Sequence, residues 1–381
     1  MKIKMIAFQN APEEVFENGK KSLIRNLPNI IFDFDDDQPE IIFFLTGGSE
    51  KAAVNAIKGQ KNIILLTHKK SNSNAAATEV KALLNKNGYP SLIVDIENKE
   101  AHNEISLFLH NDMENKPCRL GIIGKPSEWL IASTTRASVL KKRLNIELIS
   151  IPWESLPSFE TYNMSQELIE HFNESDLNIS PTSRVFTILK ETIINNELDA
   201  ITVECFYLVN KYNVTACLPL SLLNDKGIPA ACEGDIASAA GMIFVKKITG
   251  IIPWMANTVM VSEEKSLFAH CTVPLSLISN HQITTHFETG IGTAIQGDFK
   301  ETTVTLFRLD EDLERAFVTK ATIKNTPQHN WACRTQIEIQ LAKTDIAKLK
   351  NNPLGNHHLI IPGDHEKELT TALLSRHFEI I

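Results

Sequence analysis

Several features that would define the class of this protein are missing from its sequence. No apolar run approaches the ~18 residues that a membrane-spanning helix needs. The apolar stretch at the N-terminus is too short for a secretory signal. An excess of positive charge is also lacking, because 38 Lys and Arg face 46 Asp and Glu and the net charge is -8. We therefore expect a cytoplasmic protein that binds neither nucleic acid nor a membrane.

Sequence signatures of cysteine chemistry and of nucleotide binding are missing too. The six cysteines form no CxxC pair, which argues against a disulfide framework and against structural zinc. The segment TGGSE (46–50) lacks the Lys-Ser/Thr of a phosphate-binding loop, and the glycines after His286 do not follow the dinucleotide fingerprint. The sequence therefore predicts reduced thiols and gives no support to a nucleotide cofactor.

The pattern of apolar residues predicts an α/β protein with two main parts. In the first part, strand-like apolar runs alternate with helical patterns, which is typical of a doubly wound, Rossmann-like parallel sheet. From about residue 164 two helical stretches follow, and after Gly250 the chain becomes rich in strands. We predict an N-terminal α/β region at 1–163, made of one or two Rossmann-like subdomains. A catalytic domain of α+β or β-barrel-like type is predicted at 164–381.

Acidic residues stand at the ends of two predicted buried strands. ACEGDIASAAG (231–241) places Glu233 and Asp235 between an apolar approach and a run of small residues, and Glu204 lies in the apolar segment ITVECF. Burying carboxylates is costly, and carboxylates that converge in a dry place need a proton or a cation. The simpler interpretation of Glu204 is a structural, salt-bridged carboxylate. The sequence therefore predicts that a positively charged group lies next to these carboxylates.

Two adjacent histidines, His357 and His358, lead into a further predicted strand. Successive side chains of a strand point to opposite faces, so only one of the two can reach a given site. Two carboxylates and one histidine form a ligand set that suits Mn²⁺, Mg²⁺ or a similar divalent cation with open positions. The alternative is an exposed pair of histidines without a role.

A set of motifs along the chain resembles the superfamily of L-fucose and L-arabinose isomerases. The resemblance covers almost the entire chain, and its specificity comes from the order of the motifs rather than from any one of them. The chain is shorter than the classical enzymes and resembles a compact branch. The motifs are GKPSEWLIAS (124–133), ACEGDIASAAGMI (231–243), AHCTVPLSL (269–277), HFETGIGTAIQGDF (286–299), CRTQIEI (333–339) and GNHHLIIPGDH (355–365).

This resemblance implies a fucose isomerase type of catalytic domain and a metal site. The metal glutamate and aspartate of the family match Glu204 and Asp235, which would also transfer the proton, and the histidine ligand matches His357 or His358. Mn²⁺ or another divalent cation would be the cofactor.

In the arabinose branch the ligands would match Glu233 and His270. The third motif of that branch reads Met255-Ala256-Asn257 here and lacks its acid. The resemblance therefore favours the fucose-type set and leaves Glu233 and His270 as substrate-binding groups or as groups that support the ligands. The simpler alternatives are a capping carboxylate for Glu233 and a core histidine for His270.

The same resemblance implies the reaction, further substrate-binding residues and an assembly. The expected activity is aldose–ketose isomerisation of a monosaccharide through a metal-bound enediol. A silent sugar-binding protein, or a related epimerase or lyase, is the alternative. His286, Arg334 and Trp129 are candidates for substrate binding, against the simpler roles of bracing a loop or filling a core. A homo-oligomer, trimeric or hexameric, with sites between subunits is expected.

Overall fold

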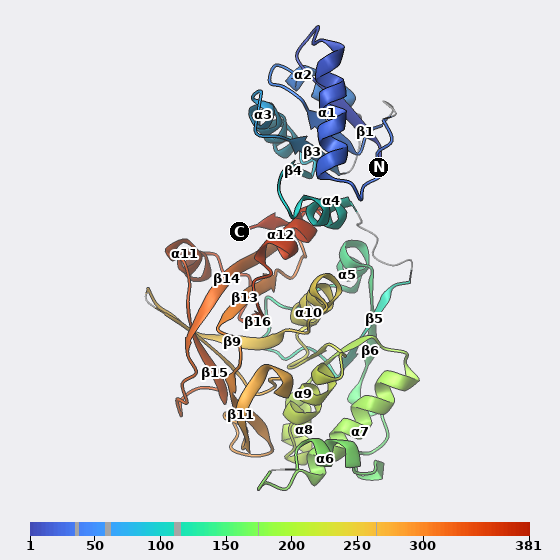
Figure 1. Cartoon of the computed structure of the whole chain (residues 1–381). Helices are drawn as coiled ribbons and strands as arrows, with labels where there is room; N and C mark the ends of the chain where they lie inside the picture. Colours follow the sequence, from blue (N-terminus) through green and yellow to red (C-terminus); the bar gives the residue numbers. More distant parts are fainter. Residues whose placement is uncertain (35–37, 58–61, 110–115, 174, 264) are drawn as a thin grey trace. The chain divides into compact units, whose positions relative to one another are not determined.

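The computed structural model describes residues 1–34, 38–57, 62–109, 116–173, 175–263 and 265–381 (Figure 1). The chain divides into two compact units. The first comprises Met1–Asp112 and Thr370–Glu379, and the second comprises Met113–Leu369 and Ile380–Ile381. None of the helices in the described ranges combines the length and apolarity that crossing a membrane requires.

The first unit contains the doubly wound parallel sheet that the apolar runs predict. Its strands pair in the order β1-β2-β3-β4, and a parallel bridge between Lys2 and Asp33 extends the sheet beyond β1. The segment at Asp33 thus lies on one side of β1, and β2 with the strands that follow it lies on the other side. Apolar side chains of α1 and α4 pack in one core, and those of α2 and α3 pack in another. The elements are β1 (Ile3–Ile6), α1 (Glu13–Asn26), β2 (Ile41–Phe44), α2 (Glu50–Ala56), β3 (Ile63–Thr67), α3 (Ser73–Lys86), β4 (Ser91–Asp95) and α4 (Ala101–Leu109).

A second parallel sheet lies in the second unit, with the strand order β6-β5-β7-β8. Its order reverses between β5 and β7, and ligands of such sheets bind beyond the carboxyl ends of strands at that point. Glu204 directly follows β7, and Glu233 follows β8 after one intervening residue. The strands are β5 (Cys118–Ile123), β6 (Ile146–Ile151), β7 (Ala200–Val203) and β8 (Ala230–Ala231).

The compact units divide at a different place from the predicted boundary after residue 163. Residues 120–123 of β5 pair with residues 200–203 of β7, so hydrogen bonds of one sheet connect both sides of the predicted boundary. The change of pattern near residue 164 marks the start of α6 (Gln166–His171) and α7 (Ser180–Asn195), which follow η1 (Trp153–Ser155) and η2 (Phe159–Thr161). Those helices are an insertion between strands of one sheet, and the units divide at residue 112 instead.

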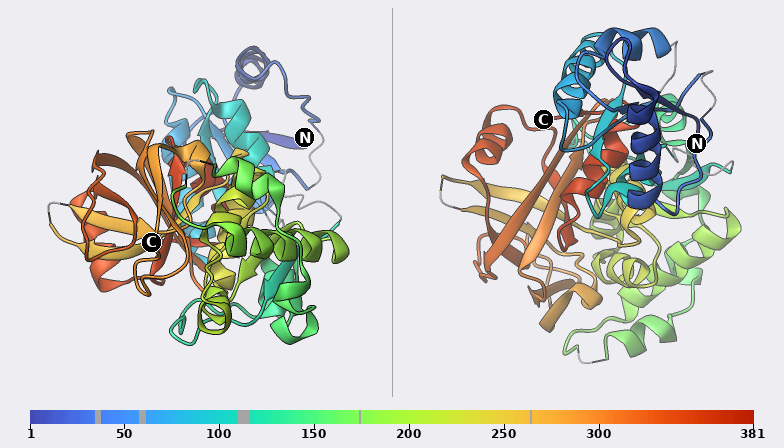
Figure 2. Two further views of the ribbon diagram at one scale, coloured as in Figure 1. Left: turned by 90° about the horizontal axis from the view of Figure 1, so that it is seen from below. Right: turned by 45° about the horizontal axis from the view of Figure 1, so that its top comes forward.

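The strand-rich segment folds into a six-stranded antiparallel barrel, as the sequence predicts. The strands pair in the order β13-β16-β9-β10-β15-β14, and pairing of β13 with β14 closes the ring. Figure 2 shows these orange and red strands on one side of the second unit and its green helices on the other. The strands are β9 (Trp254–Val261), β10 (Ser266–His270), β13 (Thr303–Leu309), β14 (Arg315–Asn325), β15 (Thr335–Gln340) and β16 (His357–Pro362).

Shorter elements complete the second unit. β11 and β12 form a separate antiparallel hairpin, and β17 pairs at the edge of β14. The remaining elements are α5 (Ala137–Leu144), α8 (Cys205–Tyr212), α9 (Cys217–Asp225), α10 (Ile236–Thr249), η3 (Leu275–Leu277), β11 (Ile278–Thr284), β12 (Ala294–Phe299), α11 (Lys343–Asn351), α12 (Glu366–Leu374), which continues into the first unit, and β17 (Glu379–Ile380).

Helix α10 connects the second parallel sheet with the barrel. It contacts β7 and β8 on the sheet and β13 and β16 on the barrel. The small residues at the start of this helix permit a close approach, because a Cβ atom on Gly241 would lie 2.9 Å from a methyl carbon of Leu359. The approach brings the carboxyl end of β8 next to the barrel strands that carry His270 and His357.

Candidate functional site

Glu233 occupies a constrained turn between β8 and α10. The φ angles of Glu233 and Gly234 are 62° and 69°. These values lie in the left-handed region, which residues other than glycine rarely adopt. A Cβ atom on Gly234 would lie 2.5 Å from the carbonyl oxygen of Lys125, so only glycine fits there. Backbone strain of this kind persists where the surrounding structure holds it, and it is common at functional sites.

Three side chains from different elements converge at this turn. Oε1 of Glu233 lies 3.7 Å from Nε2 of His270 at the end of β10 and 3.6 Å from Nε2 of His357 at the start of β16. The three candidate ligand atoms all lie within 4.8 Å of one another. Both Nε2 atoms are buried and have no hydrogen-bond partner among the residues that the structure describes. Two imidazole nitrogens and a carboxylate oxygen that face one point form a donor set that fits a divalent cation such as Mn²⁺ or Zn²⁺.

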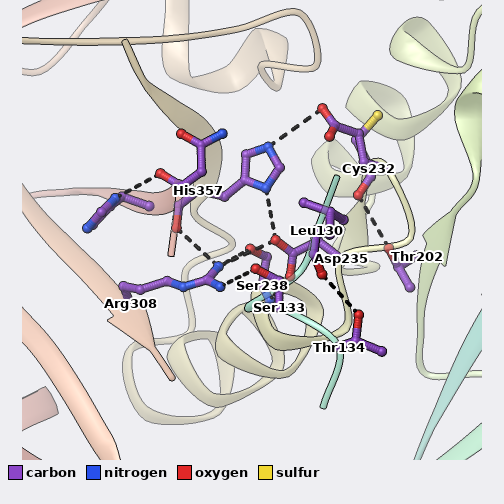
Figure 3. A network of polar contacts seen from close by, with 12 residues as sticks. Leu130, Ser133, Thr134, Thr202, Cys232, Asp235, Ser238, Arg308 and His357 are labelled. Atoms are coloured by element: carbon purple, nitrogen blue, oxygen red, sulfur yellow. Dashed lines mark hydrogen bonds and ion pairs between the residues drawn. The ribbon is translucent and has the colours of Figure 1, made fainter. Parts of the chain in front are cut away.

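The other nitrogen of each imidazole has a partner that orients the ring. Nδ1 of His357 lies 2.8 Å from Oδ2 of Asp235, as Figure 3 shows, and Nδ1 of His270 lies 3.1 Å from the hydroxyl of Thr272. Histidines that bind metals commonly have such partners, which set the tautomer and the direction of the ring. Asp235 therefore lies behind His357 and positions it.

A buried arginine on β13 balances Asp235. The guanidinium of Arg308 lies 3.4 Å from Asp235 and donates hydrogen bonds to the hydroxyls of Ser238 and Ser133 at 2.9 and 2.6 Å (Figure 3). It also donates to the carbonyl of His357 at 3.1 Å. Our sequence interpretation missed Arg308, although an arginine within the apolar run VTLFRL is a signal, because a buried charge needs a partner.

The pKa values of the cluster follow from burial and mutual attraction. Burial favours the neutral form of Glu233, but His270 and His357 outweigh it and hold the pKa of this carboxyl well below its usual range. Burial likewise opposes ionisation of Asp235, and Arg308 and His357 lower its pKa. Burial would lower the pKa of His357, yet the hydrogen bond with Asp235 and the negative charges of Glu233 and Asp235 raise it to about 9. Since a metal ligand must be a neutral imidazole, binding of a cation would release the proton of His357.

Trp129 holds the second oxygen of Glu233. Its indole nitrogen donates a hydrogen bond of 2.6 Å to Oε2, and the amide of Ser127 donates one of 2.9 Å to the carbonyl of Glu233. The indole ring packs edge-to-face on Phe206 with 4.9 Å between centroids. Trp129 is 54% exposed, so it is not a core residue, and its indole contacts Glu233 of its own chain.

Two of the residues that the family resemblance proposes as ligands lie apart from this cluster. Glu204 accepts a hydrogen bond of 3.1 Å from the amide of Lys125, lines a neighbouring cavity, and has a pKa that burial raises. His358 points to the opposite face of β16 from His357. Its Nδ1 lies 2.8 Å from the hydroxyl of Thr258, its ring packs on Phe268, and burial lowers its pKa to about 3. The structure therefore groups His357 with Glu233 and His270, the two residues assigned from sequence to substrate binding.

His286 lies in the loop 285–293 between β11 and β12, and Arg334 forms hydrogen bonds to the start of that loop. Nδ1 of His286 lies 3.1 Å from the hydroxyl of Thr289, and Arg334 donates to the carbonyl of Thr285 at 2.7 Å. His286 lines a cavity next to Glu233 and His270. The contacts of Arg334 are those of a residue that braces the loop.

The same cavity contains residues that sequence reasoning did not single out. Glu288 lines it from the loop 285–293. So does Asn257 of β9. Cysteines that are far apart in the sequence also gather here: Cys205, Cys217, Cys232, Cys271 and Cys333. No local spacing signals this grouping, because their elements meet only in the folded chain.

Comparisons with known proteins support a relation to sugar isomerases. No protein-family model matches the chain. The chain is 22% identical over 272 residues to proteins named sulfoquinovose isomerase from Priestia aryabhattai and Priestia megaterium, and these matches cover 66% of the chain and 61% of each relative. A protein of the same name from Alkalicoccus urumqiensis is 24% identical over 225 residues, which cover 56% of the chain and 50% of that protein. The chain therefore spans less than two thirds of the relatives that it matches, and it is their distant homologue.

Proposed function

We propose that this protein is a metal-dependent isomerase that interconverts an aldose and a ketose. The observation that carries the proposal is the convergence of Glu233 Oε1 with two buried imidazole nitrogens, of His270 and His357, that have no hydrogen-bond partner within the described ranges. Distant homology to proteins named sulfoquinovose isomerase supports the reaction class and places sulfoquinovose first among the sugars to test.

The proposed chemistry explains why such a site needs a cation. Aldose–ketose isomerisation moves a proton between C1 and C2 through an enediol, whose oxygens O1 and O2 acquire negative charge. Glu233, His270 and His357 would hold the divalent ion, which would supply Lewis-acid stabilisation of that charge. Mn²⁺ is the cofactor we propose, with other divalent cations as alternatives.

The remaining residues of the site hold the three ligands in position. Asp235 and Thr272 orient the two imidazoles, and Trp129 keeps Oε2 of Glu233 away from them. Arg308 neutralises Asp235, so the site carries less uncompensated negative charge. Such preorganisation lowers the cost of fixing the reacting atoms during turnover.

The first prediction tests metal binding and isomerisation together. Wild-type protein with Mn²⁺ is incubated in D₂O with sulfoquinovose, pentoses and 6-deoxyhexoses, and NMR follows ketose formation and deuterium at C1 and C2. We expect ketose formation with incorporation of deuterium. Glu233→Gln should lose at least ~100-fold in turnover, given the size of such catalytic contributions, and should bind Mn²⁺ more weakly by calorimetry.

Exposed Glu263 provides the matched control, because Glu263→Gln should behave as wild type. Unchanged Mn²⁺ affinity in Glu233→Gln would contradict the assignment of the site. Formation of C2 epimers without ketose would indicate an epimerase. Sugar binding without any turnover would indicate the silent sugar-binding protein.

A further inference from the structure

Glu288 lines the cavity that two of the three candidate metal ligands, Glu233 and His270, also line. It stands on the loop 285–293 and is exposed. Glu204, one of the two acidic residues that the family resemblance assigns to proton transfer, lines the neighbouring cavity instead. Glu233 and Glu288 are thus the two acidic residues among those that line this cavity in the described part of the chain.

Hydrogen bonds constrain the backbone of the loop that carries Glu288. The amide of His286 donates to the carbonyl of Ile291 at 3.1 Å, and the amide of Gly290 donates to the carbonyl of His286 at 2.9 Å. At the end of the loop, the amide of Thr293 donates to the hydroxyl of Thr215 at 2.9 Å. These bonds hold the backbone on both sides of Glu288, so that its carboxylate extends from a fixed position.

Glu288 differs from the other carboxylates near the site in having no partner. Glu233 has Trp129 and two histidines, Asp235 has Arg308 and His357, and Glu204 has the amide of Lys125. The carboxylate of Glu288 forms no hydrogen bond or ion pair with any residue in the described ranges. A group that carries a proton must reach the substrate and change its charge, and a carboxylate fixed by hydrogen bonds to its charged form does this poorly.

The electrostatic surroundings of Glu288 favour proton uptake. Burial of part of the side chain raises its pKa, His286 opposes that rise, and the charge of Glu233 adds to it. Glu288 can therefore take up a proton more readily than a fully exposed glutamate.

We propose that Glu288 is the general base that carries the proton between C1 and C2, an assignment that rests on the proposed isomerase function. The carboxylate takes the proton from C2 of the aldose, the electrons of that C–H bond form the C1–C2 double bond, and the carbonyl electrons move onto O1. A proton passes from O2 to O1. The carboxylic acid of Glu288 then protonates C1 with the electrons of the double bond, and electrons on O2 form the ketose carbonyl.

The test uses the full chain loaded with Mn²⁺ and the variant Glu288→Gln. We expect ketose formation and deuterium incorporation to fall by at least ~100-fold, the usual size of an acid–base contribution. Calorimetry should give Mn²⁺ and sugar affinities within about threefold of wild type, because Glu288 touches neither imidazole. Glu263→Gln serves as the control of equal charge change. In Glu288→Ala, added formate should restore part of the deuterium exchange by replacing the missing carboxylate.

The outcomes separate this assignment from the proposed function. If wild type isomerises a sugar and Glu288→Gln does so at the same rate, the assignment of Glu288 is wrong and the isomerase function stands. If Glu288→Gln loses Mn²⁺ binding together with turnover, Glu288 supports the metal site and is not the base. If wild type neither isomerises nor exchanges the hydrogen of any sugar tested, the proposed function itself is wrong.

Discussion

At the scale of single residues, the site is a chain of paired charges. Arg308 pairs with Asp235, Asp235 with His357, and His357 lies next to Glu233. Arg308, Asp235 and His357 are buried almost completely. Buried ion pairs contribute little net stability, but removal of one partner leaves an uncompensated charge, so such groups fix a geometry. Here the geometry that they fix is the direction of the His357 ring.

The partly buried carboxyl of Glu204 yields a prediction about stability and pH. Burial raises its pKa in the folded protein above the usual ~4.3 of the unfolded chain. The folded state therefore holds this proton more tightly, and stability is lost as pH rises from the unfolded pKa through the folded pKa. Glu204→Gln keeps an acceptor for the amide of Lys125 and should raise the melting temperature at pH 7 but have little effect near pH 4.

Urea or thermal unfolding at both pH values checks this expectation, with Glu128→Gln as the control. Glu128 lines the same cavity but has an exposed side chain. A lower melting temperature of Glu204→Gln at pH 7 would contradict the argument. Weaker Mn²⁺ binding by Glu204→Gln would show that Glu204 is a metal ligand, as the fucose-type resemblance implies.

At the scale of elements, strand β16 directs the side chains of two adjacent histidines to opposite faces. His357 faces the candidate metal site, and His358 packs against Phe268 and Phe317 and bonds to Thr258. We expect His357→Asn to lose at least ~10-fold in Mn²⁺ affinity, and His358→Asn to keep the affinity while losing stability from the core. Calorimetric titration with Mn²⁺ and urea unfolding measure the two effects. Equal loss of affinity in both variants would show that the face of β16 does not decide the ligand.

The start of helix α10 explains the two carboxylates in the segment 231–241. Asp235 caps the helix, accepts a hydrogen bond of 2.6 Å from the amide of Ser238, and has two cationic partners on the barrel. Glu233 precedes it in the left-handed turn and points to the two histidines. The expectation of positive charge at Asp235 is met by Arg308, which the sequence interpretation did not consider.

At the scale of the whole molecule, every residue of the candidate site lies in the second compact unit. A ligand that binds only the folded state stabilises it by RT ln(1 + [L]/Kd), about 2.7 kcal/mol at 100 times Kd. Because each unit has its own sheet and core, we expect two calorimetric transitions. Mn²⁺ should raise one transition by several degrees and leave the other in place.

Glu233→Gln supplies the control for this experiment, since its transitions should be insensitive to Mn²⁺. Proteolysis after partial heating, followed by mass spectrometry, would assign each transition to its unit. A metal-induced shift of the transition assigned to Met1–Asp112 would contradict the location of the site.

The sequence by itself determined the classes of the elements and most of the site candidates. Continuous apolar runs predicted strands that are buried on both faces, and the strand-rich segment after Gly250 predicted an α+β or barrel-like domain. Glu233, Asp235 and His357 were identified from the residues themselves, because charged and imidazole groups at the ends of apolar segments are a local signal. His270 was identified only through the family resemblance. The alternation of side chains along a strand also required that His357 and His358 face opposite ways.

Only the tertiary structure decided how these residues are combined. Which carboxylate meets the histidines depends on the left-handed turn at Glu233 and on the approach of α10 to the barrel. Because β5 pairs with β7, the two compact units divide near residue 112 and not after residue 163. Pairing within the barrel places Arg308 next to Asp235. Glu288 has no local signal, since its position depends on the contact between Thr293 and Thr215. Such contacts join residues far apart in the chain, so neither periodicity nor spacing carries information about them.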